Sequence, residues 1–200
     1  SLSPERFIQC RDGLVETRPI KGTRPRGRTP EEDRALSDEL LSSTKDRAEN
    51  VMIVDLLRND LGRVCTPGSI RVPQLCQLES YPNVHHLVSV VQGQLAAQHS
   101  PLSLLTAAFP GGSITGAPKI RAMQIIDELE PCQRSVYCGS LGYIDVRGSM
   151  DTSIAIRTMV ADDGALHVWG GGGLVAEASE TAVRPSETRG SESAQPQPTS

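Results

Sequence analysis

The stretch Ser135–Gly171, "SVYCGSLGYIDVRGSMDTSIAIRTMVADDGALHVWGG", decides the fold class of this sequence. Three pieces of it read as strands, because β-branched and aromatic residues alternate there with polar ones. The connections between the pieces, "RG" and "ADDG", are as short as hairpin turns. Strands joined by such turns run antiparallel, since a parallel crossover needs a dozen or more residues. The stretch therefore predicts an antiparallel arrangement.

More strand-like pieces lie nearer the beginning of the chain. "RFIQC", the Asp-Gly pair that follows it and "LVETRPI" together predict a hairpin. "SIRVPQ", "LCQLES" and "VHHLVSVVQGQL" are further strand candidates. "KGTRPRGRTP" is dense in glycine and proline and predicts a loop.

Helical patterns separate these groups of strands. Thr29 is typical of an N-cap and Pro30 of a first helical position, so a helix should run from there to about Leu41. A second helix is predicted over 44–62, with Gly62 as its stop. Its apolar residues recur at helical spacing: Val51, Val54, Leu57 and Leu61. "LSLLTAAF" and "APKIRAMQIIDELEP" predict two more helices, with "PGGSITGAPK" as a loop, and the whole pattern favours an α+β fold.

Composition narrows the class of protein further. The 200 residues are 38% hydrophobic, which suffices for one domain with a core, and the net charge of −4 argues against a nucleic-acid partner. No apolar run is long enough to span a bilayer, so no membrane partner is expected. The 5 cysteines are odd in number and lack C-x-x-C spacing. The thiols are therefore expected to be reduced. The first residues also show no signal-peptide pattern, so a cytoplasmic location is expected.

The composition changes near the end of the chain. Residues 176–200 are rich in Ser, Thr, Glu, Pro and Gln, and a single valine is their only large apolar residue. Such a segment cannot bury enough apolar surface to offset the entropy lost on ordering. The sequence thus predicts a folded domain over 1–175 and a disordered tail over 176–200.

Lys21 is the first candidate for chemistry. It lies in "RPIKGTRPRG" among Arg18, Arg24 and Arg26. It could be a solvated lysine, or part of a basic loop that contacts phosphate, although the 3% aromatic content argues against nucleic acid. The functional hypothesis is a nucleophilic amine whose pKa is lowered by the neighbouring cations. Arginine stays protonated and cannot fill that role.

Other candidates are individually weaker. Glu49 is either a solvent-facing helix carboxylate or a magnesium ligand shared with a bound substrate. The glycine-rich "PGGSITGAPK" precedes a helix and could form an anion site, and "WGGGGL" is a second glycine-rich turn. Arg157, on an expected strand, could bind a carboxylate or simply lie on the surface. His85 and His86 begin a strand, so one should point inward and one outward, and packing is their simplest role.

Several stretches together resemble the chorismate-utilising enzymes: "SPERF", "RPIKGTRPRG", "DRAENVMIVDLLRNDLGRV", "HHLVS", "AAFPGGSITGAPKIRAM", "CGSLGY" and "MDTSIAIRT". The resemblance is continuous from about Ser3 to Ala176. It implies an α+β fold of stacked antiparallel sheets with flanking helices, of which 1–175 would be the C-terminal part. Lys21 stands where the anthranilate and isochorismate branches typically have alanine, which favours the folate branch.

The resemblance implies a reaction and roles for individual residues. Chorismate and ammonia would become 4-amino-4-deoxychorismate, with the ammonia supplied by a glutamine amidotransferase subunit. Lys21 would be the covalent nucleophile, Glu5 the general acid, and His86 a neighbour of the leaving hydroxyl. Mg²⁺ would be the cofactor, held by Glu49 and a second glutamate.

The resemblance also implies a set of substrate contacts: Gly22, Thr23, Thr115, Gly116, Tyr137, Arg157, Gly171, Gly172 and Gly173. Two alternatives stay open. The chain could be another chorismate enzyme, such as an anthranilate synthase, or an inactive, non-enzymatic fragment.

The chain departs from the family pattern at both ends. Family members carry a long segment before the point where this sequence starts, which indicates a C-terminal fragment. After "GGGLVAE" the family usually continues with an acidic helix containing "EYQET". Here the position of the second metal glutamate is Ser186, with Glu187 one residue late, so the tail is expected to result from a reading-frame shift or an erroneous gene end.

Overall fold

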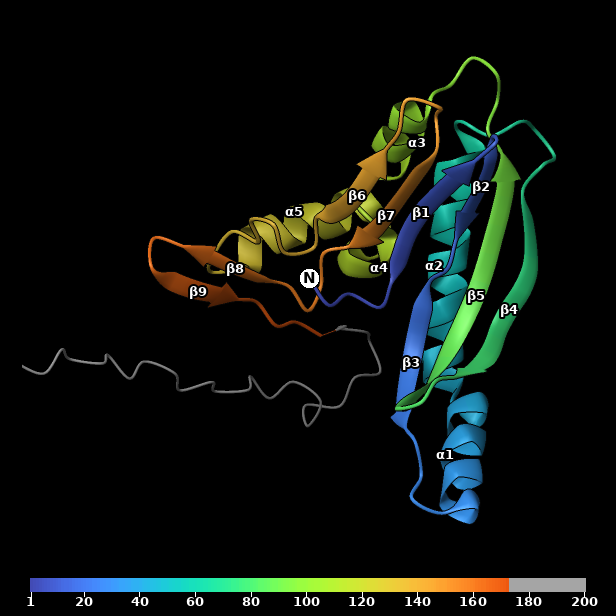
Figure 1. The fold of residues 1–200 in the computed structure, drawn as a ribbon, viewed down its shortest axis with the longest axis vertical. Helices are drawn as coiled ribbons and strands as arrows, with labels where there is room; N and C mark the ends of the chain where they lie inside the picture. The colour runs from blue at the N-terminus through green and yellow to red at the C-terminus, as the bar shows by residue number, and fades with distance from the viewer. Residues whose placement is uncertain (173–200) are drawn as a thin grey trace, which may run out of the picture. The chain divides into compact units, whose positions relative to one another are not determined.

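An antiparallel sheet of seven strands dominates the computed structural model, which describes residues 1–172 (Figure 1). The strand order is β3-β5-β2-β1-β7-β6, and β4 pairs with β5. The strands are β1 (Arg6–Arg11), β2 (Leu14–Thr17), β3 (Ile20–Pro25), β4 (Arg71–Ser80), β5 (Val84–Gln94), β6 (Ser140–Ile144) and β7 (Met150–Ile154). A separate pair is formed by β8 (Met159–Asp162) and β9 (Ala165–Val168).

Helices flank this sheet, so the predicted α+β class with antiparallel pairing is confirmed. They are α1 (Pro30–Ser42), α2 (Thr44–Gly62), α3 (Pro101–Ala108), α4 (Gly112–Thr115) and α5 (Lys119–Leu129). Within the described residues, no helix is both long and apolar enough to cross a membrane.

Local signals set the boundaries that the sequence predicted. In the β1–β2 hairpin, Asp12 and Gly13 both have positive φ, 51° and 75°, as a two-residue turn requires. Thr29 caps α1, because its Oγ1 accepts from Glu32 N at 3.2 Å. The expected bounds of α2 are confirmed as well.

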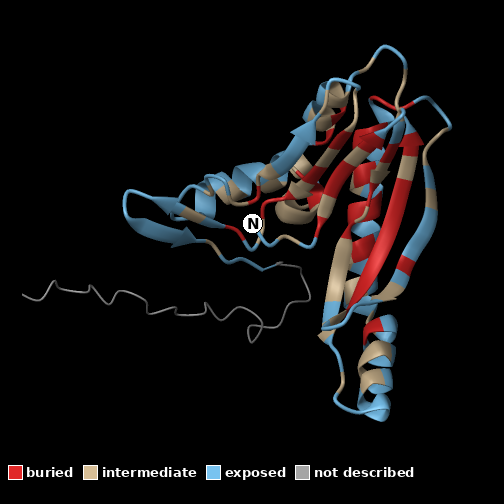
Figure 2. Ribbon diagram, in the orientation of Figure 1, coloured by how far each residue is buried: buried red, intermediate tan, exposed pale blue. Residues whose placement is uncertain are grey.

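The core lies where α2 packs against the sheet (Figure 2). Val54, Leu57 and Leu61 are buried there, as expected. Val51 is 40% exposed, so the prediction was wrong for this residue. The buried stripe begins instead at Asn50, and the next residue is turned away from it by about 100°.

Residues 112–115 form the short helix α4, although they lie inside the expected loop over 110–119. Three further expectations were wrong in detail. Residues 20–25 form β3 rather than a loop, because they hydrogen-bond to β5. "SIRVPQ" and "LCQLES" fall largely within a single strand, β4, whose register shifts along β5. The third change is at Arg157, whose φ of 48° interrupts the expected strand between β7 and β8.

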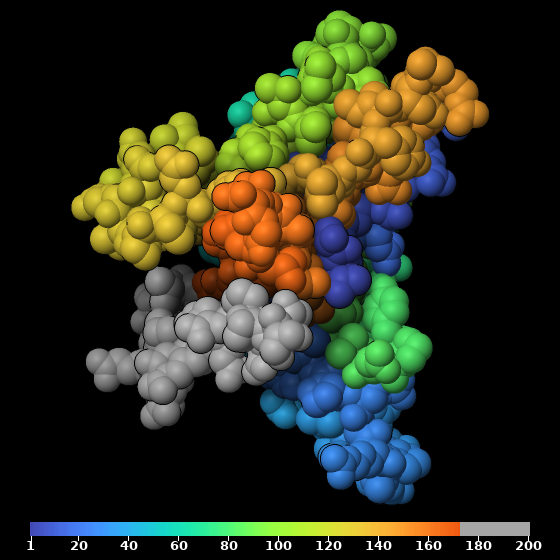
Figure 3. Space-filling view, turned by 60° about the vertical axis from the view of Figure 1, so that its left-hand side comes forward, coloured from blue at the N-terminus to red at the C-terminus, as the bar shows by residue number. Residues whose placement is uncertain are grey.

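Apolar side chains remain exposed on α5 and on the edge strand β6. None of the residues of α5 is buried, and Ile120 and Leu129 are more than two-thirds exposed. In the space-filling view, α5 forms part of the visible surface, in yellow (Figure 3). The predicted boundary at residue 175 and the predicted disorder of 176–200 lie outside the described residues.

Candidate functional site

Glu5, Lys21 and Ser113 meet although they come from distant parts of the chain. Glu5 immediately precedes β1, Lys21 lies on β3, and Ser113 lies in α4. Lys21 Nζ donates a hydrogen bond to Ser113 O at 3.0 Å. The Ser113 side chain also lies close enough to the Glu5 carboxyl group to lower the pKa of that group. Sequence reasoning identified Glu5 and Lys21 but missed Ser113, whose only signal was a small hydroxyl in a glycine-rich loop.

The Glu5 carboxyl group is buried, with 7% of the residue exposed. Burial raises the pKa of Glu5, although the charge of Lys21 and the nearby Ser113 side chain act in the opposite direction. Glu5 and Ser113 line a cavity of about 10 Å³, which has room for about one water molecule. A carboxyl group in this environment holds its proton to higher pH than usual, as a general acid must.

The arginines expected to surround Lys21 are each paired with a carboxylate. Arg18 pairs with Glu79, and Arg24 Nε lies 2.8 Å from Glu39 Oε1. Arg26 Nε lies 2.7 Å from Asp33 Oδ1. Their charges are therefore largely compensated, and repulsion from them does not explain the choice of lysine. The role of Lys21 rests instead on its contact with Ser113 and on the electrostatic influence of its charge on Glu5.

Thr23 and His86 form a second group beside the first. Thr23 Oγ1 and His86 Nδ1 are 2.8 Å apart, and His86 is 5% exposed. Burial lowers the pKa of His86, and the positive charge of Arg157 lowers it further, while Glu79 opposes both. The structure thus places the Arg157 charge close enough to act on His86. Arg157 itself is exposed, as one of its two expected roles allows, but it lies outside any strand, contrary to expectation.

The expectation that one of the two histidines points outward was wrong. His85 is as buried as His86, with 2% exposed. Its Nε2 lies 3.0 Å from Asp33 Oδ1 in α1, and its Nδ1 lies 2.8 Å from Ser80 Oγ. Both faces of β5 are covered at this point, so the alternation of side chains does not expose either ring.

Gly22 lies on β3 where this strand packs against α1 and α2, and Glu49 lies on α2. Glu49 is half-buried on α2. Gly22 has a φ of 87°, and a Cβ there would lie 2.7 Å from Leu40 Cδ1, so no other residue fits without rearrangement. Among the described residues, no group of three His, Cys, Asp or Glu side chains could hold a metal ion. A single protein carboxylate is compatible with magnesium, which usually keeps several water ligands and is also coordinated by groups of a substrate.

Thr115 and Tyr137 line a different pocket, of about 780 Å³, between α5 and the chain that leads into β6. Thr115 Oγ1 donates to Gly111 O at 3.0 Å, and Gly116 ends α4 with a φ of 119°. The Tyr137 ring stacks on Trp169, with centroids 6.5 Å apart. The structure therefore groups these residues together, but on a separate pocket from Glu5.

The predicted glycine contacts near the end of the chain are only partly described. Gly171 and Gly172 belong to a second unit that begins at Gly170. Gly173, Ser186 and Glu187 lie outside the described residues.

The fold agrees with comparisons to known proteins. The profile of the chorismate binding enzyme family matches residues 1–182. The chain therefore belongs to the chorismate binding enzymes. The match extends six residues past the Ala176 limit estimated from motifs.

Individual relatives show which enzymes of this family the chain is similar to. The chain is 60% identical over 91% of its length to aminodeoxychorismate synthase component 1 of Klebsiella aerogenes, and spans 40% of that protein. It is 55% identical over 88% of its length to anthranilate synthase component 1 of Pseudomonas putida, of which it spans 36%. The crystal structure of anthranilate synthase component I from Streptococcus pneumoniae superimposes with a TM-score of 0.70 at 44% identity, over 78% of this chain and 34% of that one.

We expect His86 to make the stability of the fold pH-dependent. Because its pKa is lowered on folding, the unfolded chain takes up a proton first as pH falls through the ordinary histidine value of about 6.5. The stability that neutral His86 contributes is present above that value and is lost below it. Urea midpoints measured from about pH 7 to pH 5 should therefore fall less steeply in His86→Gln than in the wild type. His167→Gln, on exposed β9, is the matched control, and equal slopes in His86→Gln and the wild type would contradict the prediction.

Proposed function

We propose that this chain carries the catalytic lysine of an aminodeoxychorismate synthase component 1, which converts chorismate and ammonia to 4-amino-4-deoxychorismate for p-aminobenzoate and folate synthesis. The observation that carries the proposal is the cluster of the Lys21 amine, the buried Glu5 carboxyl group and Ser113. The 58–60% identity to bacterial proteins of that name supports it. The chain spans 40% of their length, so the rest of the catalytic surface would come from further chain.

The proposed chemistry uses a nucleophile and an acid. The Lys21 nitrogen forms a bond to ring carbon C2, the double bonds shift, and the C4–O bond breaks. The hydroxyl leaves as water with the proton of Glu5. Ammonia then attacks C4, and the C2–N bond to Lys21 breaks, so the lysine is regenerated. Arg157, Thr23 and Gly22 would hold the carboxylates of the substrate, because guanidinium, hydroxyl and exposed backbone N–H groups donate to carboxylate oxygens.

Magnesium is part of the proposal. Glu49 would contribute one carboxylate, and the substrate and water would supply other ligands. The ion would neutralise the ring carboxylate of chorismate when bound.

A partner that supplies ammonia is also part of the proposal. The words "component 1" in the names of the relatives support a second component. Hydrolysis of glutamine by an amidotransferase subunit is the chemical class that would deliver ammonia to the site. Ammonium salts would replace this partner in an assay.

The test is to identify the amino product. The complete native protein, given chorismate, Mg²⁺ and ammonium, should form 4-amino-4-deoxychorismate, detected by chromatography and mass. Formation of anthranilate would instead support the second candidate, an anthranilate synthase, which the 55% identity to the Pseudomonas putida protein makes the related alternative. No amino product at all would support the inactive fragment.

We expect Glu49→Gln to raise the magnesium concentration needed for half activity by roughly tenfold, since affinity depends on ligand charge. The change keeps the size of the side chain, so the melting temperature should stay that of the wild type. Glu31→Gln, at an exposed position of α1, is the matched control. A magnesium titration that is the same for Glu49→Gln and the wild type would assign Glu49 to the solvent-facing surface.

A further inference from the structure

Lys119 stands where a lysine is electrostatically disfavoured. It is the first residue of α5, and the N-cap Pro118 makes no side-chain capping bond. The N-terminus of a helix carries partial positive charge, so a cation there costs free energy. The side chain is nonetheless only 14% exposed. Contacts outside α5 must therefore stabilise this ammonium group.

Those contacts come from α2 and α3. Lys119 Nζ donates to Asp60 Oδ2 at 2.5 Å and to Ala108 O at 2.9 Å. Asp60 lies in α2, is 1% exposed, and also pairs with Arg63. Removing one partner of so buried an ion pair would leave the other charge uncompensated. The Lys119–Asp60 ion pair is therefore costly to break, and it holds the start of α5 against α2.

This pair holds both ends of the segment 109–118 against α2. Ala108, whose carbonyl accepts from Lys119, precedes the segment, and Lys119 itself follows it. Ser113 lies in the middle, where its carbonyl accepts from Lys21 Nζ. The path from the ion pair to the reactive amine is therefore a short stretch of backbone anchored at each end.

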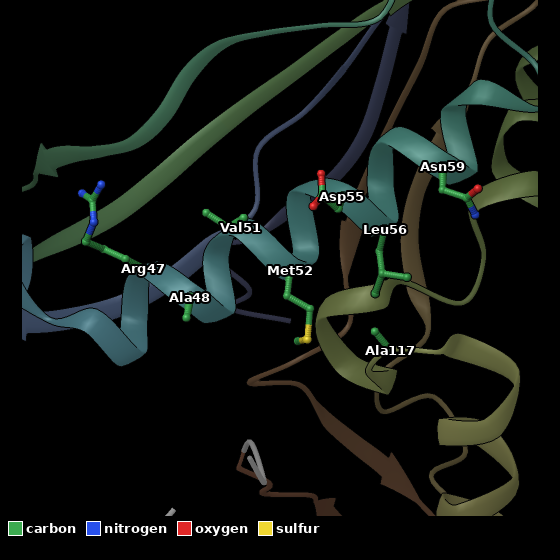
Figure 4. A pocket seen from close by; sticks show the side chains of 8 residues that line it. All are labelled: Arg47, Ala48, Val51, Met52, Asp55, Leu56, Asn59 and Ala117. Carbon is green, nitrogen blue, oxygen red and sulfur yellow. The ribbon is translucent and has the colours of Figure 1, made fainter. Parts of the chain in front are cut away.

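Two glycines in the middle of the segment pack closely against neighbouring side chains. A Cβ on Gly112 would lie 2.9 Å from Leu56 Cδ1, and one on Gly111 would lie 2.7 Å from Ile154 Cδ1. In Figure 4 the Leu56 side chain points from α2 toward Ala117, beside a groove of about 700 Å³. Gly111 and Gly112 are closely packed next to Ser113, so a shift of the anchored ends of the segment should be passed on to Ser113, because packed interiors transmit strain.

We propose that the Lys119–Asp60 ion pair is a positioning device for the reactive lysine. It fixes segment 109–118 and, through Ser113, sets the place of the Lys21 amine relative to the Glu5 carboxyl group. Lys119 and Asp60 are positioning residues. The expected effect on turnover rests on the proposed function, whereas the effect on the Lys21 amine does not.

The experiment uses the complete native protein with Lys119→Met, which removes the charge and keeps the length of the side chain. The rate at which acetic anhydride acetylates Lys21, followed by peptide mass, should rise because Ser113 no longer holds the amine. With chorismate and ammonium, kcat should fall by roughly 10- to 100-fold, and by more than KM rises. Lys119→Arg keeps a cation that can reach Asp60. It should return both the Lys21 acetylation rate and kcat most of the way to the wild-type values. Lys45→Met, at an exposed position of α2, should match the wild type.

A purely structural role would lower the melting temperature of Lys119→Met and leave Lys21 acetylation and kcat unchanged at temperatures where the protein is folded. That result would overturn the proposal. If Lys119→Met does not fold, Asp60→Asn, which keeps an acceptor for Lys119, takes its place. Its Lys21 acetylation rate and kcat are then compared with those of the wild type. If the wild type does not consume chorismate, the proposed function fails, and the acetylation rates still decide whether the ion pair positions Lys21.

Discussion

Lys21→Ala should lose turnover of chorismate by roughly 10³- to 10⁶-fold, the scale seen when the nucleophile of covalent catalysis is removed. The amine is the only atom at this position that can form a bond to the ring. The variant should fold, because Lys21 is partly exposed and its recorded hydrogen bond is to a backbone carbonyl. The rate of 4-amino-4-deoxychorismate formation at saturating ammonium measures the effect.

Lys21→Arg separates nucleophilicity from charge. Arginine keeps the positive charge but cannot provide a free lone pair at neutral pH, so it should be as inactive as alanine. Lys45→Arg, at an exposed position of α2, controls for the substitution itself. Substantial activity in Lys21→Arg would show that position 21 supplies charge alone.

Glu5→Gln should lower kcat by roughly 10²- to 10⁴-fold, the usual contribution of a general acid. Glutamine keeps the size of the side chain but has no acidic proton. Since burial raises the pKa of Glu5, wild-type kcat should fall as pH rises through that value, where the acid is lost. The variant should lack this part of the pH–rate profile.

A pH profile that keeps its basic limb in Glu5→Gln would assign that limb to another group. Glu16→Gln, on β2, is a useful control. Glu16 pairs with Arg6 and Arg18 rather than with Lys21.

The sequence predicted well those features that local chemistry determines. The caps at Thr29 and Ser43 and the Asp12–Gly13 turn act within a few residues, so α1, α2 and the first hairpin were predicted with accurate bounds. Strand β3 was missed because its stabilisation comes from pairing with β5, which is distant in the chain. Propensity alone could not reveal it, since strand formation depends on neighbours and burial.

The candidate site could likewise be predicted only where short motifs mark its residues, and not where it depends on contacts distant in the chain. Motif resemblance pointed to Lys21 and Glu5, and the structure places both beside Ser113. Ser113 itself could not be inferred, because it lies 92 residues from Lys21 and contributes a backbone carbonyl, which no side-chain pattern marks. The pairing of Arg18 with Glu79, across 61 residues, was hidden for the same reason, so the expected crowd of free cations around Lys21 was wrong.

The central claim is that Lys21 attacks the chorismate ring. The most direct measurement is to mix the complete native protein with chorismate and Mg²⁺ without ammonia, quench the reaction, and map the mass of every lysine-containing peptide. The peptide with Lys21 should gain the mass of chorismate less one water, and added ammonium should remove this adduct at the rate of product formation. An unmodified Lys21 peptide during turnover, or an adduct on Lys45 or Lys119 instead, would contradict it.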